Sequence, residues 1–169
     1  FAEADWLTWV QDVVAACTWL QSQPLADGAD KPAPPLWLWG LRTGCLLAAE
    51  AAQHLETPCN FVFWAPTPSG KTVLEQFLRV GAAAHMASGN AKAAMAGIRE
   101  RIAKRLPVEV AGYTLTADLI DGLENAVLLP PQPTSRHADV LWFELSTRAD
   151  ASFTPVATKS IENWASAGH

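Results

Sequence analysis

Basic residues are scarce in this sequence. It contains 12 Lys and Arg against 17 Asp and Glu, which gives a formal net charge of −5. A nucleic-acid-binding domain normally presents a basic face, so this balance argues against nucleic acid as a partner. No apolar run reaches the length of a membrane span, so we expect no transmembrane helix.

Cysteine is scarce as well. Cys17, Cys45 and Cys59 are the three cysteines of the chain, and each lies inside an apolar segment. Their separations do not match a metal-ligand motif, so we expect buried, reduced thiols, no metal site and no cofactor. Reduced thiols are typical of cytoplasmic proteins, which makes the cytoplasm the expected location.

What the sequence does contain is an alternation of short apolar runs with helical patterns. The runs predict buried strands, and they lie at 36–39 (LWLW), 60–64 (NFVFW) and 139–145 (DVLWFEL). Apolar residues at helical spacing predict helices over 5–23, 45–55, 73–84, 91–102, 116–123 and 154–168. Thr116 and Thr154 precede two of these helices as N-caps. Buried strands that alternate with helices predict an α/β fold with a parallel sheet.

Residues 64–77 (WAPTPSGKTVLEQF) contain a relaxed form of the phosphate-binding P-loop pattern. Residues 70–72 supply its Gly-Lys-Thr ending, and Ala65 stands where the first glycine is usual. The segment follows a predicted strand and precedes a predicted helix, which is the context that a P-loop requires. Nucleotide binding is therefore one interpretation of this segment.

The prolines of the segment argue against that interpretation. Pro66 and Pro68 each remove a backbone N–H that could bind phosphate. A Mg²⁺-binding Asp is also missing from the end of the strand at 139–145, which has only Glu144 within it. In the alternative interpretation Ser69 N-caps the next helix, and the loop leads into an inserted helical cap.

The turn at residues 40–44 (GLRTG) lies between a predicted strand and a predicted helix. A strand, a tight turn with two glycines and a buried helix form the layout of a nucleophile elbow, in which the central residue is exposed above the sheet. That central residue is Arg42. Because a guanidinium stays protonated, Arg42 cannot attack a carbonyl, but it can bind a carboxylate or phosphate.

Three segments in order, PLWLWGLRTGCLLA, FVFWAPTPSGKTVLEQFLRV and VEVAGYTLTADLIDGL, carry a family resemblance. The chain resembles the α/β-hydrolase-like proteins associated with the exosortase A system, in particular the second type of such hydrolase. The resemblance implies a bacterial cytoplasmic protein linked to exopolysaccharide production and to exosortase-system proteins. It also implies that further strands precede residue 1 and that one strand and a catalytic His follow residue 169.

Under this resemblance Asp150 occupies the usual position of the catalytic acid, although it equally fits an Asp in a turn near a helix start. Thr43 and Cys45 are alternative nucleophiles beside Arg42, and we expect both to be structural. His54, His85 and His137 are expected at the surface, and His169 precedes the expected position of the base. The Ser-His-Asp mechanism therefore has no complete set of residues here.

The domain prediction is an α/β-hydrolase-like core at 1–65 and 136–169, interrupted by a helical cap at 66–135. Arg42, Thr43 and Lys71 are the predicted ligand-binding residues, because the carboxyl ends of parallel strands are where such sheets bind ligands. In one hypothesis Arg42 and Lys71 converge on an anionic group; in the other Arg42 pairs with an acid of the cap.

Two functions follow from these residues. The first is hydrolysis or transfer of an ester or acyl substrate, and the second is binding of an anionic ligand or a protein partner without catalysis. The oligomeric state and the identity of the substrate do not follow from the sequence.

Overall fold

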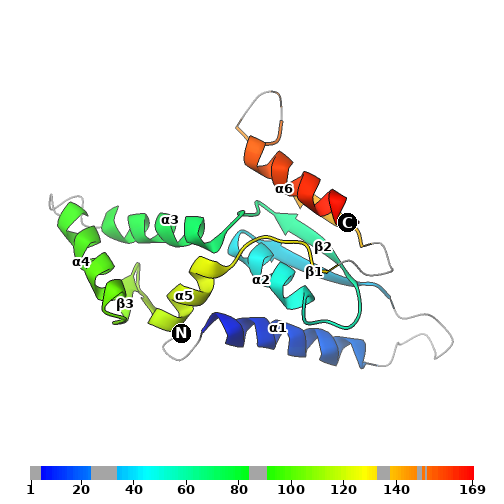
Figure 1. Ribbon diagram of the computed structural model, residues 1–169, viewed down its shortest axis with the longest axis horizontal. Coiled ribbons are helices and arrows are strands. Elements are labelled where there is room, and N and C mark those ends of the chain that lie inside the picture. The colour runs from blue at the N-terminus through cyan, green and yellow to red at the C-terminus, as the bar shows by residue number, and fades with distance from the viewer. Residues whose placement is uncertain (1–4, 24–33, 84–90, 133–137, 148–149, 151) are drawn as a thin grey trace. The chain divides into compact units, whose positions relative to one another are not determined.

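The fold was analysed in a computed structural model, which describes residues 5–23, 34–83, 91–132, 138–147, 150 and 152–169. The elements follow one another as α1 (Trp6–Gln21), β1 (Leu36–Leu41), α2 (Thr43–Ala52), β2 (Cys59–Trp64), α3 (Gly70–Ala83), α4 (Ala91–Ala103), β3 (Val108–Val110), β4 (Tyr113–Leu115), α5 (Ala117–Asn125), β5 (Val140–Phe143) and α6 (Pro155–Ser166) (Figure 1). All the predicted strands and helices are present, within a few residues of their predicted bounds.

The helix ends follow the predicted local chemistry. The Thr116 hydroxyl accepts a hydrogen bond from the Leu119 N–H at the start of α5, and Thr154 accepts one from Ala157 at the start of α6. Pro155 occupies the first turn of α6, where its missing N–H costs nothing. These caps satisfy N–H groups that have no partner inside their own helix.

The chain divides into two compact units. One unit comprises Phe1–Trp9 and Ser69–Ala126, and the other comprises Val10–Pro68 and Val127–His169. We call them the helical unit and the sheet unit. Among the described residues of both units, no helix is long and apolar enough to cross a membrane.

The sheet unit contains a small parallel sheet in the order β1-β2-β5, flanked by helices. This confirms the predicted α/β class at the level of a small parallel sheet. In the register of the sheet, Leu41 lies opposite Trp64 and Trp64 lies opposite Phe143. The three strands therefore end together, and the residues that follow them share one edge.

One face of this sheet is covered by helices. Phe61 and Phe63 of β2 are fully buried, and both contact the ring of Trp164 of α6 edge-on, at centroid distances of 5.1 and 5.0 Å. Gly40 of β1 lies against Cys45 of α2 on the same face. Such edge-to-face contacts are the favoured geometry for aromatic pairs.

The other face is exposed in the described structure, and we call it the exposed face. Its large side chains are Trp37, Trp39, Leu41, Trp64, Leu141 and Phe143. Trp39 is 68% exposed and stacks obliquely on Trp64, which in turn contacts Phe143. Parallel sheets normally bury both faces, so this apolar surface is unusual for a sheet of this type.

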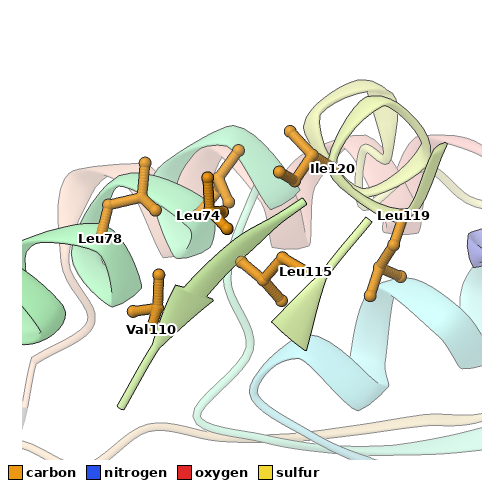
Figure 2. Packing of buried hydrophobic residues seen from close by; sticks show 7 residues of the cluster. Leu74, Leu78, Val110, Leu115, Leu119 and Ile120 are labelled. Atoms are coloured by element: carbon orange, nitrogen blue, oxygen red, sulfur yellow. The ribbon is translucent and has the colours of Figure 1, made fainter. Parts of the chain in front are cut away.

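The helical unit has a core of its own, part of which is shown in Figure 2. Its buried members are Leu74, Leu78, Val108, Val110, Leu115, Leu119 and Ile120. They come from α3, from α5 and from the antiparallel hairpin of β3 and β4. The hairpin turns at Ala111 and Gly112, whose φ angles of 51° and 83° are both positive, as a two-residue hairpin turn of type I′ requires.

Candidate functional site at the carboxyl edge of the sheet

The turn between β1 and α2 consists of one residue, Arg42. Its φ of 51° and ψ of −113° lie in a region that L-residues rarely adopt. The Arg42 N–H donates to the Trp64 carbonyl at 2.9 Å, which continues the sheet by one step, and the Arg42 carbonyl accepts from Cys45 at 3.1 Å. The chain thus passes from strand to helix at one strained and exposed residue.

The two glycines around Arg42 have different roles. A Cβ at Gly40 would lie 2.5 Å from the Cα of Cys45, so only glycine lets α2 approach β1 this closely. A Cβ at Gly44 would meet nothing within 4 Å. Of the two glycines of this turn, close packing therefore requires Gly40 but not Gly44.

The two alternative nucleophiles lie on α2. Cys45 is fully buried, and its thiol donates to the Gly40 carbonyl at 3.2 Å. Burial raises the pKa of the Cys45 thiol to about 11, which keeps it protonated at neutral pH. Thr43 is half-buried as the first residue of the helix. Cys45 is thus a structural thiol, because a reactive cysteine needs a lowered pKa and access to substrate.

The turn after β2, residues 65–69, is longer and begins with a second strained residue. Ala65 has a φ of 48°, and its N–H donates to the Phe143 carbonyl at 2.7 Å. Pro66 and Pro68 have no N–H. The Gly70 N–H donates to the Ala126 carbonyl at 2.9 Å. Several groups that a P-loop would direct at phosphate are therefore missing or already bonded within the protein.

Gly70 lies against helix α5. A Cβ at this position would come within 1.8 Å of the Leu123 carbonyl oxygen, so glycine is required for packing between α3 and α5. Ser69 accepts from the Thr72 N–H at 3.4 Å, as the alternative interpretation of an N-cap predicts. These contacts favour a helix start over a phosphate cradle.

Lys71 belongs to the helical unit, and Arg42 belongs to the sheet unit. The Lys71 ammonium lies 3.8 Å from Glu124 of α5, and both side chains are largely exposed. The predicted convergence of Arg42 and Lys71 on one ligand stays a prediction. Within its own unit Lys71 has a carboxylate neighbour.

Asp150, the predicted acid, lies in an exposed turn and accepts a hydrogen bond from the Ser152 N–H at 3.2 Å. Another carboxylate, Glu144, directly follows β5. Its two oxygens accept from the backbone N–H and the hydroxyl of Thr154, both at 3.2 Å. Sequence reasoning did not select Glu144 as a site residue, although its position at the end of the apolar run was a usable signal.

The histidines supply no base at this edge in the described structure. His54 is exposed, as predicted, whereas His85 and His137 lie outside the described residues. His169 packs its ring near Phe61 and Trp164, at centroid distances of 6.2 and 5.2 Å. It also lines a cavity of about 110 Å³ together with Cys59, the first residue of β2.

That cavity lies at the amino end of β2, opposite to the edge that carries Arg42. It is smaller than the roughly 300 Å³ at which ligand pockets usually begin. Burial, together with the smaller effect of the neighbouring Cys17 thiol, raises the pKa of the Cys59 thiol to about 12. All three cysteines are buried and free, as predicted, and none is activated.

Among the residues that the structure describes, no group of three His, Cys, Asp or Glu side chains could hold a metal ion. In comparisons with known proteins, no family model, no curated protein and no solved structure matches this chain. The assignment of function therefore depends on the geometry of the carboxyl edge and on the three sequence segments.

Proposed function

We propose that this chain is part of an α/β-hydrolase-like protein whose elbow binds an anionic group and does not attack a substrate. The observation that carries the proposal is the conformation of Arg42. A strained, one-residue turn presents its side chain at the carboxyl edge of the sheet, where a nucleophile would otherwise stand. Strain of this kind is typical of functional positions.

The chemistry at the elbow favours anion binding. Arg42 occupies the N-cap position of α2, and backbone N–H groups at a helix start attract negative charge. A guanidinium adds a permanent positive charge and a fork of donors that matches a carboxylate or phosphate. Cys45, the one thiol of the turn, is buried and protonated. Binding without catalysis is therefore the function that this edge supports best.

A second candidate is hydrolysis or transfer of an ester or acyl group, as the family resemblance implies. The close approach of α2 to β1 at Gly40 favours it, because an elbow of this shape is how α/β hydrolases expose their nucleophile. In this proposal Asp150 is the catalytic acid, and no residue is assigned as the nucleophile or as the base. The same resemblance places the protein in the bacterial cytoplasm, beside exopolysaccharide production and the exosortase system.

A serine-directed fluorophosphonate probe separates the two candidates. We expect no labelling of the protein, and we expect inorganic phosphate to raise its melting temperature. Arg42→Met should abolish the rise, whereas the control Arg79→Met, which removes a guanidinium paired with Glu75 on α3, should retain it. Labelling would establish the enzyme, and an unchanged phosphate effect in Arg42→Met would refute anion binding at the elbow.

Nucleotide binding stays a remote alternative. The hydrogen bonds of Ala65 and Gly70 argue against it. A titration with Mg²⁺-ATP that gives no more stabilisation than phosphate is the expected result. Saturable binding of ATP that is lost in Lys71→Met would replace our proposal.

A further inference from the structure

The exposed face of the sheet unit is apolar and rich in aromatic side chains. Because side chains alternate along a strand, its members are every second residue of β1, β2 and β5. In register they form two complete rows across the sheet, Trp39-Val62-Leu141 and Leu41-Trp64-Phe143. Neither row contains a charged residue. An aromatic centre without charge is the composition that distinguishes the core of a protein interface from ordinary protein surface.

Polar groups border this face at the amino end of the strands. Asn60 of β2 lies opposite Trp37 of β1, and the Asn60 side-chain oxygen accepts a hydrogen bond from the Asp139 N–H at 2.9 Å. Asp139 is exposed and directly precedes β5. A polar rim beside an aromatic centre is the usual layout of a surface that binds another protein.

The area of the exposed face is large enough for such an interface. Its four aromatic residues are between 40% and 68% exposed. Since a whole aromatic side chain presents roughly 150–250 Å², the four together expose about 400 Å². Leu41 and Leu141, each about half exposed, bring the apolar area to roughly 550 Å². Two such faces packed together would bury about 1,100 Å², slightly more than the roughly 1,000 Å² that a biological interface needs.

A second copy of this chain is the partner whose chemistry matches the exposed face. A partner with a charged surface would gain no ion pair in the two rows and would lose the hydration of its own charges. A second copy presents an equally neutral face of the same size. Association about a two-fold axis therefore brings apolar groups onto apolar groups and leaves no charge of the two rows unpaired.

We propose that two copies of the chain associate through their exposed faces, sheet on sheet, in a closed pair. Sheets that pack face to face lie about 10 Å apart, with their side chains interdigitated. Each copy then covers the second face that a parallel sheet normally buries. This inference is independent of anion binding at the elbow, because no member of the exposed face belongs to the turns at Arg42 and at 65–69.

Sedimentation equilibrium of the whole chain over a range of concentrations tests this inference. The average mass should rise from that of one chain to that of two, with a midpoint in the micromolar range, the weak end for an interface of this kind. Quenching of tryptophan fluorescence by acrylamide should weaken over the same range, because Trp37, Trp39 and Trp64 become covered. A mass that stays at one chain, or that grows beyond two, overturns the closed pair.

A lysine in the middle row should prevent the association. Trp39→Lys should weaken it at least about thirtyfold, the effect of losing a central aromatic residue of an interface. Leu141→Lys places the charge on the other edge strand and should act in the same direction. Trp19→Lys on α1 is the matched control, because Trp19 is 64% exposed and Trp39 is 68% exposed. This control should associate like the unmodified protein.

Circular dichroism and the melting temperature verify that each variant is folded, and either of the two face variants suffices for the test. Association that persists in a folded Trp39→Lys or Leu141→Lys protein overturns the exposed face as the interface. An equal loss of association in Trp19→Lys overturns it as well, because the effect would then come from any added charge and not from the face.

Discussion

The two turns that leave the sheet at its carboxyl edge differ in how they use their backbone. The turn at Arg42 is one residue long, and the helix that follows it lies directly against β1. The turn at 65–69 is longer, contains two prolines and directs its helix start at α5. Both begin with a residue of positive φ.

The difference lies in what each helix start contacts. At α3, the Gly70 N–H is bonded to Ala126, and its Cα faces the Leu123 carbonyl. At α2, an exposed Arg42 stands at the helix start. The turn that resembles a phosphate-binding loop in sequence is thus engaged in packing, and the turn that lacks such a pattern presents the cation.

The largest effect is expected from Gly70→Ala. The added Cβ would overlap a backbone oxygen that cannot rotate away, so α3 and α5 must separate. We expect the free energy of unfolding to fall by at least about 3 kcal/mol. The control Gly97→Ala meets nothing within 4 Å inside α4 and should raise stability by about 0.5–1 kcal/mol. Urea denaturation measures the free energy of unfolding of both variants. If Gly70→Ala is as stable as the unmodified protein, α3 does not pack against α5 at this residue, and the turn would be free to bind ligand.

The elbow gives a matched pair of glycines for the same test. Gly40→Ala would place a Cβ 2.5 Å from the Cα of Cys45, whereas Gly44→Ala meets nothing. We expect Gly40→Ala to cost about 2–3 kcal/mol and Gly44→Ala to be neutral or slightly stabilising. Thermal denaturation of the two variants compares them directly. Equal losses of stability in the two variants would contradict the close packing of α2 against β1 at Gly40.

Because the thiols are buried, we expect the stability of the folded protein to depend on pH. Burial raises the pKa of Cys45 from 9.0 to about 11, so the folded protein favours the protonated thiol. The stability that this provides is complete below pH 9 and is lost as the pH rises through 11. Iodoacetamide at pH 8.5, followed by mass spectrometry, should label Cys45 slowly in the native protein and rapidly in urea. Rapid native labelling would contradict a structural role.

Arg42→Gly should raise stability, because glycine adopts the positive φ of this turn without strain. The expected gain is about 1 kcal/mol. Arg42→Ala removes the same charge but keeps the strain, so it serves as the control and should show no such gain. If Arg42→Gly and Arg42→Ala raise the free energy of unfolding equally, relief of backbone strain at Arg42 is not the cause of the increase.

The smallest effect is expected from Lys71→Met. Exposed ion pairs such as that of Lys71 with Glu124 contribute about 0–1 kcal/mol, and this one is 3.8 Å long. The melting temperature should therefore change by little, and binding of phosphate should persist. A loss of phosphate binding would show that Lys71 acts with Arg42 after all.

The local structure could largely be predicted from the sequence. The spacing of apolar residues predicts the strands and helices, and capping residues predict where helices begin. Thr116 and Thr154, for example, cap helices by local hydrogen bonds that need no tertiary contact. The elbow was also predictable, since Gly40 and the helix that follows it form a local motif.

What could not be predicted depends on partners distant in sequence. The bond from Gly70 to Ala126 argues against a P-loop, and no local pattern in the sequence indicates it. The Glu144 carboxylate is oriented by hydrogen bonds from Thr154, ten residues later in the sequence. The exposure of Trp39 and Phe143 was likewise hidden, because a strand buried on both faces and a strand with one exposed apolar face have the same sequence pattern.

Amide chemical shifts in a ¹H–¹⁵N spectrum, recorded during titration with inorganic phosphate, test the central claim most directly. Anion binding at the elbow predicts that the largest shifts fall on the amides of Arg42, Thr43 and Gly44, while Ser69, Gly70 and Lys71 change little. Largest shifts at 69–71, or no saturable shift at 42–44, would contradict it.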